Sequence, residues 1–239
     1  MHRVQKNNKR VPQKVLIYVE GRNTEPSYFE LLKNTTVDII PIKVVPGTGI
    51  GSCVQFINKI YGEYNSLSKK DKSKYKQIWA VFDCDGHPDF ELAIKKAVEL
   101  GFKVAFSNMC IEYWFMLHFY DHNGDSIPIK NNSHSQAQIE EINRYIKKYN
   151  KGKSPQDQIG EYNIDSKKVE EDFFELMLAI DPVTNNRRIV DAYQRAKRIH
   201  ASKKNNGAEY RESVTTMYDL LAQIGVIKDD DNGIIMNIC

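Results

Sequence analysis

Residues 14–20 read K-V-L-I-Y-V-E, and residues 77–85 read Q-I-W-A-V-F-D-C-D. Each stretch is a short apolar run that ends at an acidic residue, which is typical of a strand buried in a parallel sheet. Helical patterns lie between these runs and two further strand candidates, residues 39–45 and 103–106. Because strands alternate with helices four times over, the sequence predicts an α/β fold with a four-stranded parallel sheet flanked by helices.

The connecting segments carry recognisable helix and loop signals. Glu25 and Pro26 suit the first turn of a helix that Thr24 can cap. The glycine-rich loop at 46–51 lacks the lysine of a phosphate-binding P-loop, so we favour a flexible loop over a phosphate contact. The segments expected between the strands are a helix from Thr24, this loop, a helix to about Leu67, a solvated basic linker over 69–76, and a helix from Pro88 to about Gly101.

After Ser107 the pattern changes from alternating strands and helices to helices alone. Residues 111–120 are apolar on nearly all sides and predict a buried helix, in which His118 is interpreted as a core histidine. A polar loop over 121–135 follows, and then helical periodicities at about 136–150, 165–180, 186–204 and 213–225. We therefore expect a basic arm over residues 1–13, an α/β core over 14–120 and a mostly helical carboxyl-terminal region over 121–239.

Composition narrows the class of protein. The 239 residues are 41% hydrophobic and carry a net charge of +3, which suits a globular domain and permits a polyanionic partner without requiring one. The four cysteines show no CxxC spacing, so a disulfide scaffold and a zinc ribbon are not expected. No signal peptide or membrane span is recognisable, and we expect a cytoplasmic protein with free thiols.

Acidic residues follow two of the predicted strands. Glu20 ends the first strand, and Asp83 and Asp85 end the third. The carboxyl ends of parallel strands meet at one edge of a sheet, and residues i and i+2 of an extended chain point the same way. Carboxylates gathered there repel each other unless a cation neutralises them, so we expect Glu20, Asp83 and Asp85 to bind Mg²⁺, or Mn²⁺ in its place.

Longer motifs around these acids resemble a known family. A Glu after the first strand and Asp-x-Asp after the third resemble the Toprim domain of topoisomerases, primases and nucleases. V-E-G-R-N-T-E-P-S-Y-F at 19–29, F-D-C-D-G-H at 82–87 and N-M-C-I-E-Y-W-F-M-L-H-F at 108–119 are similar to the RloB family of Toprim-like proteins, as is S-V-T-T-M-Y-D-L-L at 213–221. The resemblance covers roughly residues 14–225. It implies a nuclease linked to bacterial anti-phage defence, in some cases beside a partner ATPase.

The resemblance also implies roles for single residues. Glu20 would act as general acid/base or orient the attacking group, while Asp83 and Asp85 would hold Mg²⁺. Glu25 and Glu112 match further acids of the family motifs. Glu25 can equally oppose the dipole of its helix. His87 is a candidate to bind phosphate or orient an aspartate, and a plain surface turn is the alternative.

A basic stretch lies far from these acids in the sequence. Residues 187–204 hold seven Lys or Arg and one Asp. Contact with a nucleic-acid backbone is one interpretation, and a solvated helix face is the other. The residues proposed to contact nucleic acid are Arg187, Arg188, Arg195, Lys197 and Arg198.

Three functions stay open on the sequence. The favoured one is a metal-dependent nuclease acting on DNA or RNA, with nucleic acid, a partner ATPase or a second copy of the chain as partners. The second is a haloacid-dehalogenase-like phosphohydrolase, in which Asp83 would be the nucleophile of a D-x-D-G motif. Two features oppose it, because the motif follows the third strand instead of the first and His87 replaces the usual Thr or Ser. The third is a non-catalytic module that binds nucleic acid or an ATPase.

Overall fold

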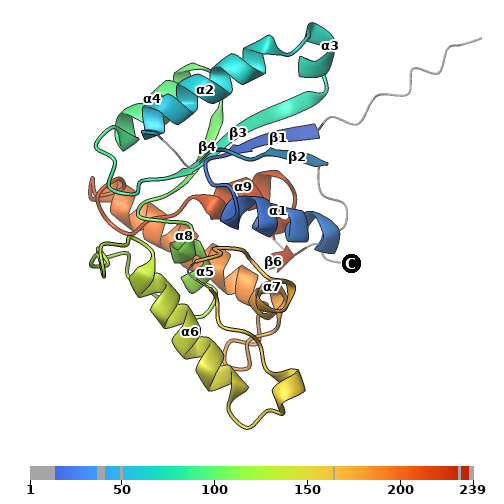
Figure 1. The fold of residues 1–239 in the computed structure, drawn as a ribbon, viewed down its shortest axis with the longest axis vertical. Helices are drawn as coiled ribbons and strands as arrows, with labels where there is room; N and C mark the ends of the chain where they lie inside the picture. The colour runs from blue at the N-terminus through green and yellow to red at the C-terminus, as the bar shows by residue number, and fades with distance from the viewer. Residues whose placement is uncertain (1–13, 37–40, 49–50, 164, 231–232, 237–239) are drawn as a thin grey trace, which may run out of the picture.

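The computed structural model describes residues 14–36, 41–48, 51–163, 165–230 and 233–236. Four parallel strands form the central sheet, in the order β2-β1-β3-β4 (Figure 1). This arrangement confirms the predicted four-stranded parallel sheet. The strands are β1 (Lys14–Val19), β2 (Ile42–Val45), β3 (Tyr75–Asp83) and β4 (Lys103–Ser107).

The register of the sheet brings the ends of its strands together. Val19 pairs with Val81, and Asp83 pairs with Ser107. The N–H of Glu20 donates to the carbonyl of Val81 (3.0 Å), so the chain leaves β1 alongside the last residues of β3. All four carboxyl ends lie on one edge, where a parallel α/β sheet binds its ligands.

Helices cover both faces of the sheet. Helices α2 (Cys53–Ser66) and α4 (Phe90–Glu99) pack on each other on one face, and α1 (Thr24–Thr35) lies on the opposite face with the carboxyl-terminal helices (Figure 1). Helix α5 (Glu112–Met116) is buried in this second layer, where Trp114 donates to the hydroxyl of Tyr28 (3.1 Å). One hydrophobic cluster contains buried side chains from both halves of the chain.

The carboxyl-terminal region is mostly helical, as predicted. The described helices there are α6 (Gln136–Asn150), α7 (Glu171–Leu178), α8 (Arg188–Asn205) and α9 (Met217–Gln223), with a 3-10 turn at Pro155–Asp157. Helix α9 begins four residues later than expected because the preceding segment pairs with the edge of β4, where Thr216 N–H donates to Phe106 O (2.8 Å). No helix in the described ranges has the length and apolar character needed to cross a membrane.

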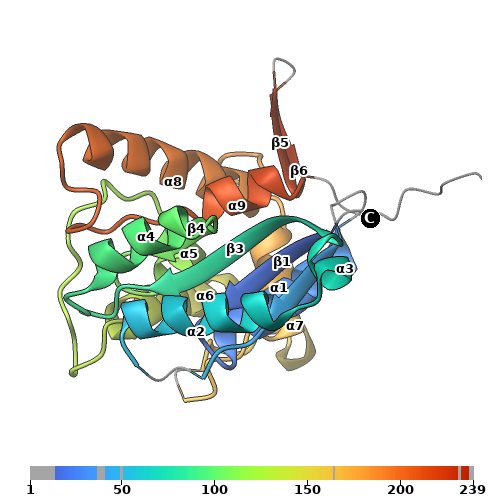
Figure 2. The ribbon, with the colours of Figure 1, turned by 90° about the horizontal axis from the view of Figure 1, so that it is seen from above.

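Several predicted boundaries and one element were wrong. An antiparallel hairpin of β5 (Ile227–Asp230) and β6 (Gly233–Met236) follows α9 and projects from the body of the molecule (Figure 2), where only helices were expected. The supposed linker over 69–76 contains helix α3 (Lys69–Lys72), capped by Ser68, and the first residues of β3. The predicted helix over 111–120 is regular only to Met116, and the helix expected at Pro88 begins at Phe90. The basic arm over 1–13 and residues 39–40 lie outside the described residues.

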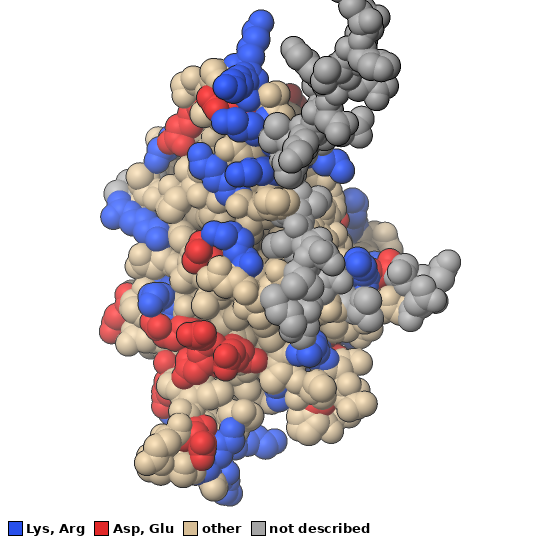
Figure 3. All heavy atoms as spheres, turned by 90° about the vertical axis from the view of Figure 1, so that its right-hand side faces the viewer, with Lys and Arg blue, Asp and Glu red and all other residues tan. Residues whose placement is uncertain are grey.

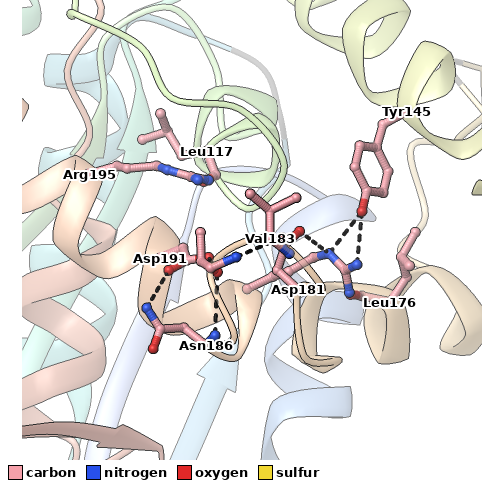
Figure 4. Close-up of polar contacts among 10 residues, drawn as sticks. Leu117, Tyr145, Leu176, Asp181, Val183, Asn186, Asp191 and Arg195 are labelled. Atoms are coloured by element: carbon pink, nitrogen blue, oxygen red, sulfur yellow. Dashed lines mark hydrogen bonds and ion pairs between the residues drawn. The ribbon is translucent and has the colours of Figure 1, made fainter. Parts of the chain in front are cut away.

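A buried arginine joins α8 to the neighbouring helices. Arg188 is 2% exposed and lies 3.3 Å from the carboxylate of Asp181. Its guanidinium donates to the hydroxyl of Tyr145 on α6 (2.8 and 3.1 Å) and to the carbonyl of Leu176 on α7 (3.2 Å). Figure 4 shows these partners around the start of α8, where Asp191 accepts hydrogen bonds from the preceding turn. Because every partner is inside the protein, Arg188 is a structural residue of the helical layer.

Replacing Arg188 is expected to destabilise the fold strongly. Arg188→Ala leaves Asp181 without its cation in a largely buried place, and breaking a buried pair costs about 3–5 kcal/mol. Arg198→Ala is the matched control on the same helix, since its ion pair with Asp121 is exposed and such pairs contribute about 1 kcal/mol or less. Urea denaturation of both variants measures the difference. Equal losses would show that the buried contacts of Arg188 contribute no more than a surface pair.

Candidate functional site

Five carboxylates surround one cavity of about 250 Å³ at the carboxyl edge of the sheet. The three acids proposed as metal ligands and the two further acids of the motifs all line it, and so does His87. They come from the end of β1, the first turn of α1, the end of β3 and the turn after it, and the start of α5. In chain order the acids are Glu20, Glu25, Asp83, Asp85 and Glu112.

Hydrogen bonds hold four of these acids in place. The N–H of Asp83 donates to Glu20 Oε2 (3.3 Å), and the N–H of Ile111 donates to Asp83 Oδ2 (2.9 Å). Glu25 accepts from the N–H of Gly21 (3.2 Å). The hydroxyl of Tyr162 donates to Glu112 (3.3 Å). Acids that are distant in the sequence are thus tied to the ends of the same few strands and helices.

Asp85 reaches the cavity by a different route from the one expected. We expected an extended chain to align it with Asp83, but β3 ends at Asp83 and Asp85 has φ +44°. Its N–H donates to the carbonyl of Met109 (3.1 Å), which itself has φ +98°. Left-handed backbone is unfavourable for residues other than glycine and tends to occur at functional sites. A left-handed turn after the strand, and not strand alternation, therefore positions Asp85.

Burial shifts the ionisation of the whole group. Burial raises the pKa of Glu20 to about 7 against the opposing hydrogen bond from Asp83, and the charges of Asp85 and Asp89 add to the rise. Burial likewise raises the pKa of Glu25 to about 7. The pKa of Asp83 lies well above its usual value because of burial and then the charge of Glu25. These carboxyl groups therefore resist carrying full negative charge together.

Cations moderate the ionisation of two of the acids. Burial raises the pKa of Glu112 and of Asp85, while the positive charge of Lys167 lowers both. His134 and His87 also lower the pKa of Asp85. The site is therefore an acidic cavity with a few basic groups at its boundary.

The donor chemistry of the cavity fits a hard divalent cation. Carboxylate oxygens are the protein ligands of Mg²⁺, which binds through one or two of them and keeps several waters. Among the described residues, no three His, Cys, Asp or Glu side chains already form a metal-binding cluster. The carboxylate oxygens present fit such a cation in kind, with Glu20, Asp83 and Asp85 as the groups that could hold it.

Two cations at this cavity were not predicted from the sequence. Arg22 follows β1, and Lys167 belongs to the carboxyl-terminal region. The loop that carries Lys167 is bound to the start of α1, where Thr24 Oγ1 donates to Lys167 O (2.6 Å) and Asn23 Nδ2 donates to Ser166 O (3.1 Å). The contact joins residues 143 positions apart, and no local pattern in the sequence indicates it.

The glycine-rich loop lies beside the acids, but its helix already has partners. Gly47 N–H donates to Gly21 O (3.3 Å), and Gly51 lines the cavity. At the start of α2, Ser52 forms a capping box, and Asp89 accepts from the N–H of Val54 (3.0 Å). These contacts already use amides that a phosphate would need at the helix terminus. Residues 49–50 of the loop lie outside the described residues.

The basic stretch of α8 contacts other parts of the protein. Arg195 donates to the carbonyl of Leu117 (2.8 Å), Lys197 pairs with Asp229, and Arg198 pairs with Asp121. Arg187 donates to Leu178 O (3.1 Å). None of these residues, nor Arg188, lines the acidic cavity. Contact between this stretch and nucleic acid stays a prediction, and of the five residues proposed for it Lys197 and Arg198 are exposed.

A second group of cations lies at the opposite edge of the sheet. Figure 3 shows Lys and Arg side chains gathered at the top of one face, where α3 lies. Helix α3 leads into the first residues of β3, and so into the amino edge of the sheet. These cations are therefore separated from the acidic cavity by the length of β3.

The fold and the cavity define a parallel α/β protein with an acidic cavity at the carboxyl edge of its sheet. The family model described as RloB-like protein matches residues 15–224, and the chain belongs to this family. Comparisons with curated proteins and with solved structures gave no match. The match spans the sheet, the acidic residues and the helical region together.

The acidic cavity should make the stability of the metal-free protein depend on pH. Its free energy of unfolding should be larger in mild acid than at pH 8, because the carboxyl groups of the cavity carry less charge in acid. A carboxyl whose pKa is raised by folding binds its proton more tightly when folded, so the stability that it contributes is full below its unfolded pKa of 4.5 and is lost as the pH rises to about 7. Asp83→Asn removes one such group. In EDTA it should raise the free energy of unfolding at pH 8, by on the order of 1–3 kcal/mol, and raise it by less at pH 5.5, where the neighbouring acids are largely protonated.

Asp121→Asn is the control for this pH dependence. The hydrogen bond from Arg198 lowers the pKa of Asp121, so this carboxyl stays ionised from pH 5.5 to 8. Its replacement should have the same small effect at both pH values. A stabilisation by Asp83→Asn that does not change with pH would contradict the proposed repulsion among the buried acids.

Proposed function

We propose that the protein is a Mg²⁺-dependent nuclease of the Toprim type that hydrolyses phosphodiester bonds in DNA or RNA. The observation that carries the proposal is the contact between Glu20 and Asp83 within a cavity that also contains Asp85. Membership of the RloB-like family supports the same chemistry, since its motifs resemble those of Toprim nucleases. Mn²⁺ is proposed as an alternative ion.

Asp83 and Asp85 are the proposed metal ligands. When bound, Mg²⁺ would polarise a phosphoryl oxygen and stabilise the charge of the displacement. The N–H of Ile111 fixes one oxygen of Asp83, and the left-handed turn fixes Asp85. The Asp83 carboxylate is thus oriented by a backbone donor, which reduces the side-chain freedom that it would lose on binding an ion.

Glu20 is the proposed general acid/base. A pKa of about 7 is close to that of an efficient proton-transfer group at neutral pH. Glu20 Oε2 accepts from the N–H of Asp83, which leaves Oε1 to take a proton from attacking water or return one to the leaving oxygen. Glu25 and Glu112 also line the cavity, where their negative charges raise the pKa of Asp83.

The biological part of the proposal rests on the family resemblance. We propose a role in bacterial anti-phage defence, in the cytoplasm, with a partner ATPase in some loci. A haloacid-dehalogenase-like phosphohydrolase and a non-catalytic binding module are the competing functions. Phosphate release from small monoesters would identify the first of these, and nucleic-acid binding without cleavage in any divalent metal would identify the second.

Removing either proposed metal ligand should abolish Mg²⁺ binding. Asp83→Asn and Asp85→Asn each replace a carboxylate by a neutral amide, which is a poor ligand for a hard cation. Isothermal titration calorimetry should show the loss of Mg²⁺ binding, and circular dichroism should show an intact fold. Asp121→Asn, remote from the cavity, should bind Mg²⁺ like the unaltered protein. Unchanged affinity in both site variants would refute the metal assignment.

Replacing Glu20 should separate catalysis from binding. Glu20→Gln keeps an acceptor for the N–H of Asp83 but loses the titrating group, so cleavage should fall by about 10²–10⁴-fold. Affinity for nucleic acid should change little, because a general acid/base acts mainly in the transition state. Single-turnover cleavage and fluorescence anisotropy measure the two quantities. Full activity in the variant would assign Glu20 a purely structural role.

A further inference from the structure

An acidic cavity cannot hold a polyanion without nearby positive charge. Five carboxylates face the cavity, and a phosphodiester backbone brings further negative charge to it. A bound cation would offset only part of this repulsion. The substrate therefore needs cationic side chains at the rim, and their identity follows from which cations line the cavity.

Two cations meet this requirement. Among the described residues, Arg22 and Lys167 are the Lys or Arg side chains that line the cavity. Both are exposed, and neither has an ion-pair partner within the described part of the chain. The Nε of Arg22 donates to the carbonyl of Thr48, which orients the guanidinium while leaving its terminal nitrogens available.

The backbone beneath Lys167 is held firmly although its side chain is exposed. Lys167 has φ +48°, and its N–H donates to Asn163 O (3.0 Å). Its carbonyl accepts from Thr24, and the next buried residue, Val169, donates to Ser27 Oγ (2.9 Å). Thr24 and Ser27 belong to the first turn of α1, which also contains Glu25. The start of α1 thus both contains Glu25 and holds the backbone of Lys167.

The neighbouring lysine, Lys168, differs from Lys167 in its ion pairing and in its position relative to the cavity. Lys168 is exposed like Lys167, but it pairs with Glu170 (3.3 Å) and does not line the cavity. Arg195, Lys197 and Arg198 of α8 also have partners in the protein and lie outside the cavity. Position and free charge together therefore distinguish Lys167 from the other lysines of this region.

We propose that Lys167, with Arg22, forms a binding site for a backbone phosphate of the substrate beside the carboxylates. The inference rests on the proposed function, because it takes a phosphodiester as the ligand. It adds that the carboxyl-terminal region supplies a substrate-binding residue to a cavity built mainly from the sheet. Lysine suits this role as a point charge on a flexible stem, and arginine can grip phosphate through two nitrogens.

The test is the salt dependence of nucleic-acid binding by the full chain. Lys167→Ala is compared with Lys168→Ala, the adjacent control, by fluorescence anisotropy in EDTA with a DNA duplex and with single-stranded DNA and RNA. Losing one phosphate contact should reduce the slope of log K against log salt by about 0.9 on duplex DNA and about 0.7 on a single strand. It should also weaken duplex binding roughly fivefold at physiological salt.

Further variants test whether the charge and the position of Lys167 are responsible for the effect. Lys167→Arg should retain the slope because it keeps the charge. Thr24→Val, which removes the hydrogen bond to Lys167 O, should weaken binding and add little to Lys167→Ala in the double variant. If Lys167→Ala keeps the slope of the unaltered protein, the proposal is overturned. Tighter Mg²⁺ binding with an unchanged slope would also overturn it, because Lys167 would then serve only to neutralise the acids.

The experiment distinguishes failure of the nuclease proposal from failure of the phosphate-site proposal. The slope needs only binding, so it can be measured whether or not the protein cleaves its probe. Salt-dependent binding that falls with Lys167→Ala, but no cleavage in Mg²⁺ or Mn²⁺, would refute the nuclease while supporting the phosphate site. Cleavage with an unchanged slope would refute the phosphate site while supporting the nuclease.

Discussion

The backbone N–H of Asp83 donates to Glu20, and the carboxylate of Asp83 accepts from the N–H of Ile111. One residue therefore joins the end of β1, the end of β3 and the segment that enters α5. The parallel pairing of β1 with β3 makes the first contact possible, since it places Val19 opposite Val81. The second contact fixes the start of α5 and, with it, Glu112. These two hydrogen bonds therefore hold together the segments that carry Glu20, Asp83 and Glu112.

The same arrangement places the fold under electrostatic strain. Grouping carboxyls where burial already raises their pKa costs free energy at neutral pH, and the protein offsets part of that cost with backbone donors, Tyr162 and Lys167. Left-handed backbone at Asp85 and Met109 adds a further conformational cost. Such costs would be removed by selection for stability alone, so their concentration around one cavity favours a functional site over a structural one.

The sequence predicted the parts that depend on local pattern. Buried strands produce continuous apolar runs, and acids at their ends must meet at one edge, so Glu20 and Asp83 were placed correctly. Glu112 was reached only through the family resemblance, because an acid in an apolar helix has no local explanation. Lys167 was missed, since its position depends on a contact across 143 residues. Arg188 was grouped with nucleic-acid contacts because charge composition does not reveal burial. The β5–β6 hairpin was missed although the sequence places Asn-Gly between two short apolar runs, which is a hairpin signal.

Lys167 and Arg188 show how the helical region serves two purposes. Arg188 binds α6 and α7 to α8 within the helical layer, which contacts the central sheet through α1 and α9. The loop between α6 and α7 then reaches α1 and places Lys167 at the cavity, while Tyr162 of the same loop contacts Glu112. The sheet alone would present carboxylates without the groups that moderate their charge. The acidic edge of the sheet and the helical layer therefore both contribute side chains to one cavity, and the family match spans both.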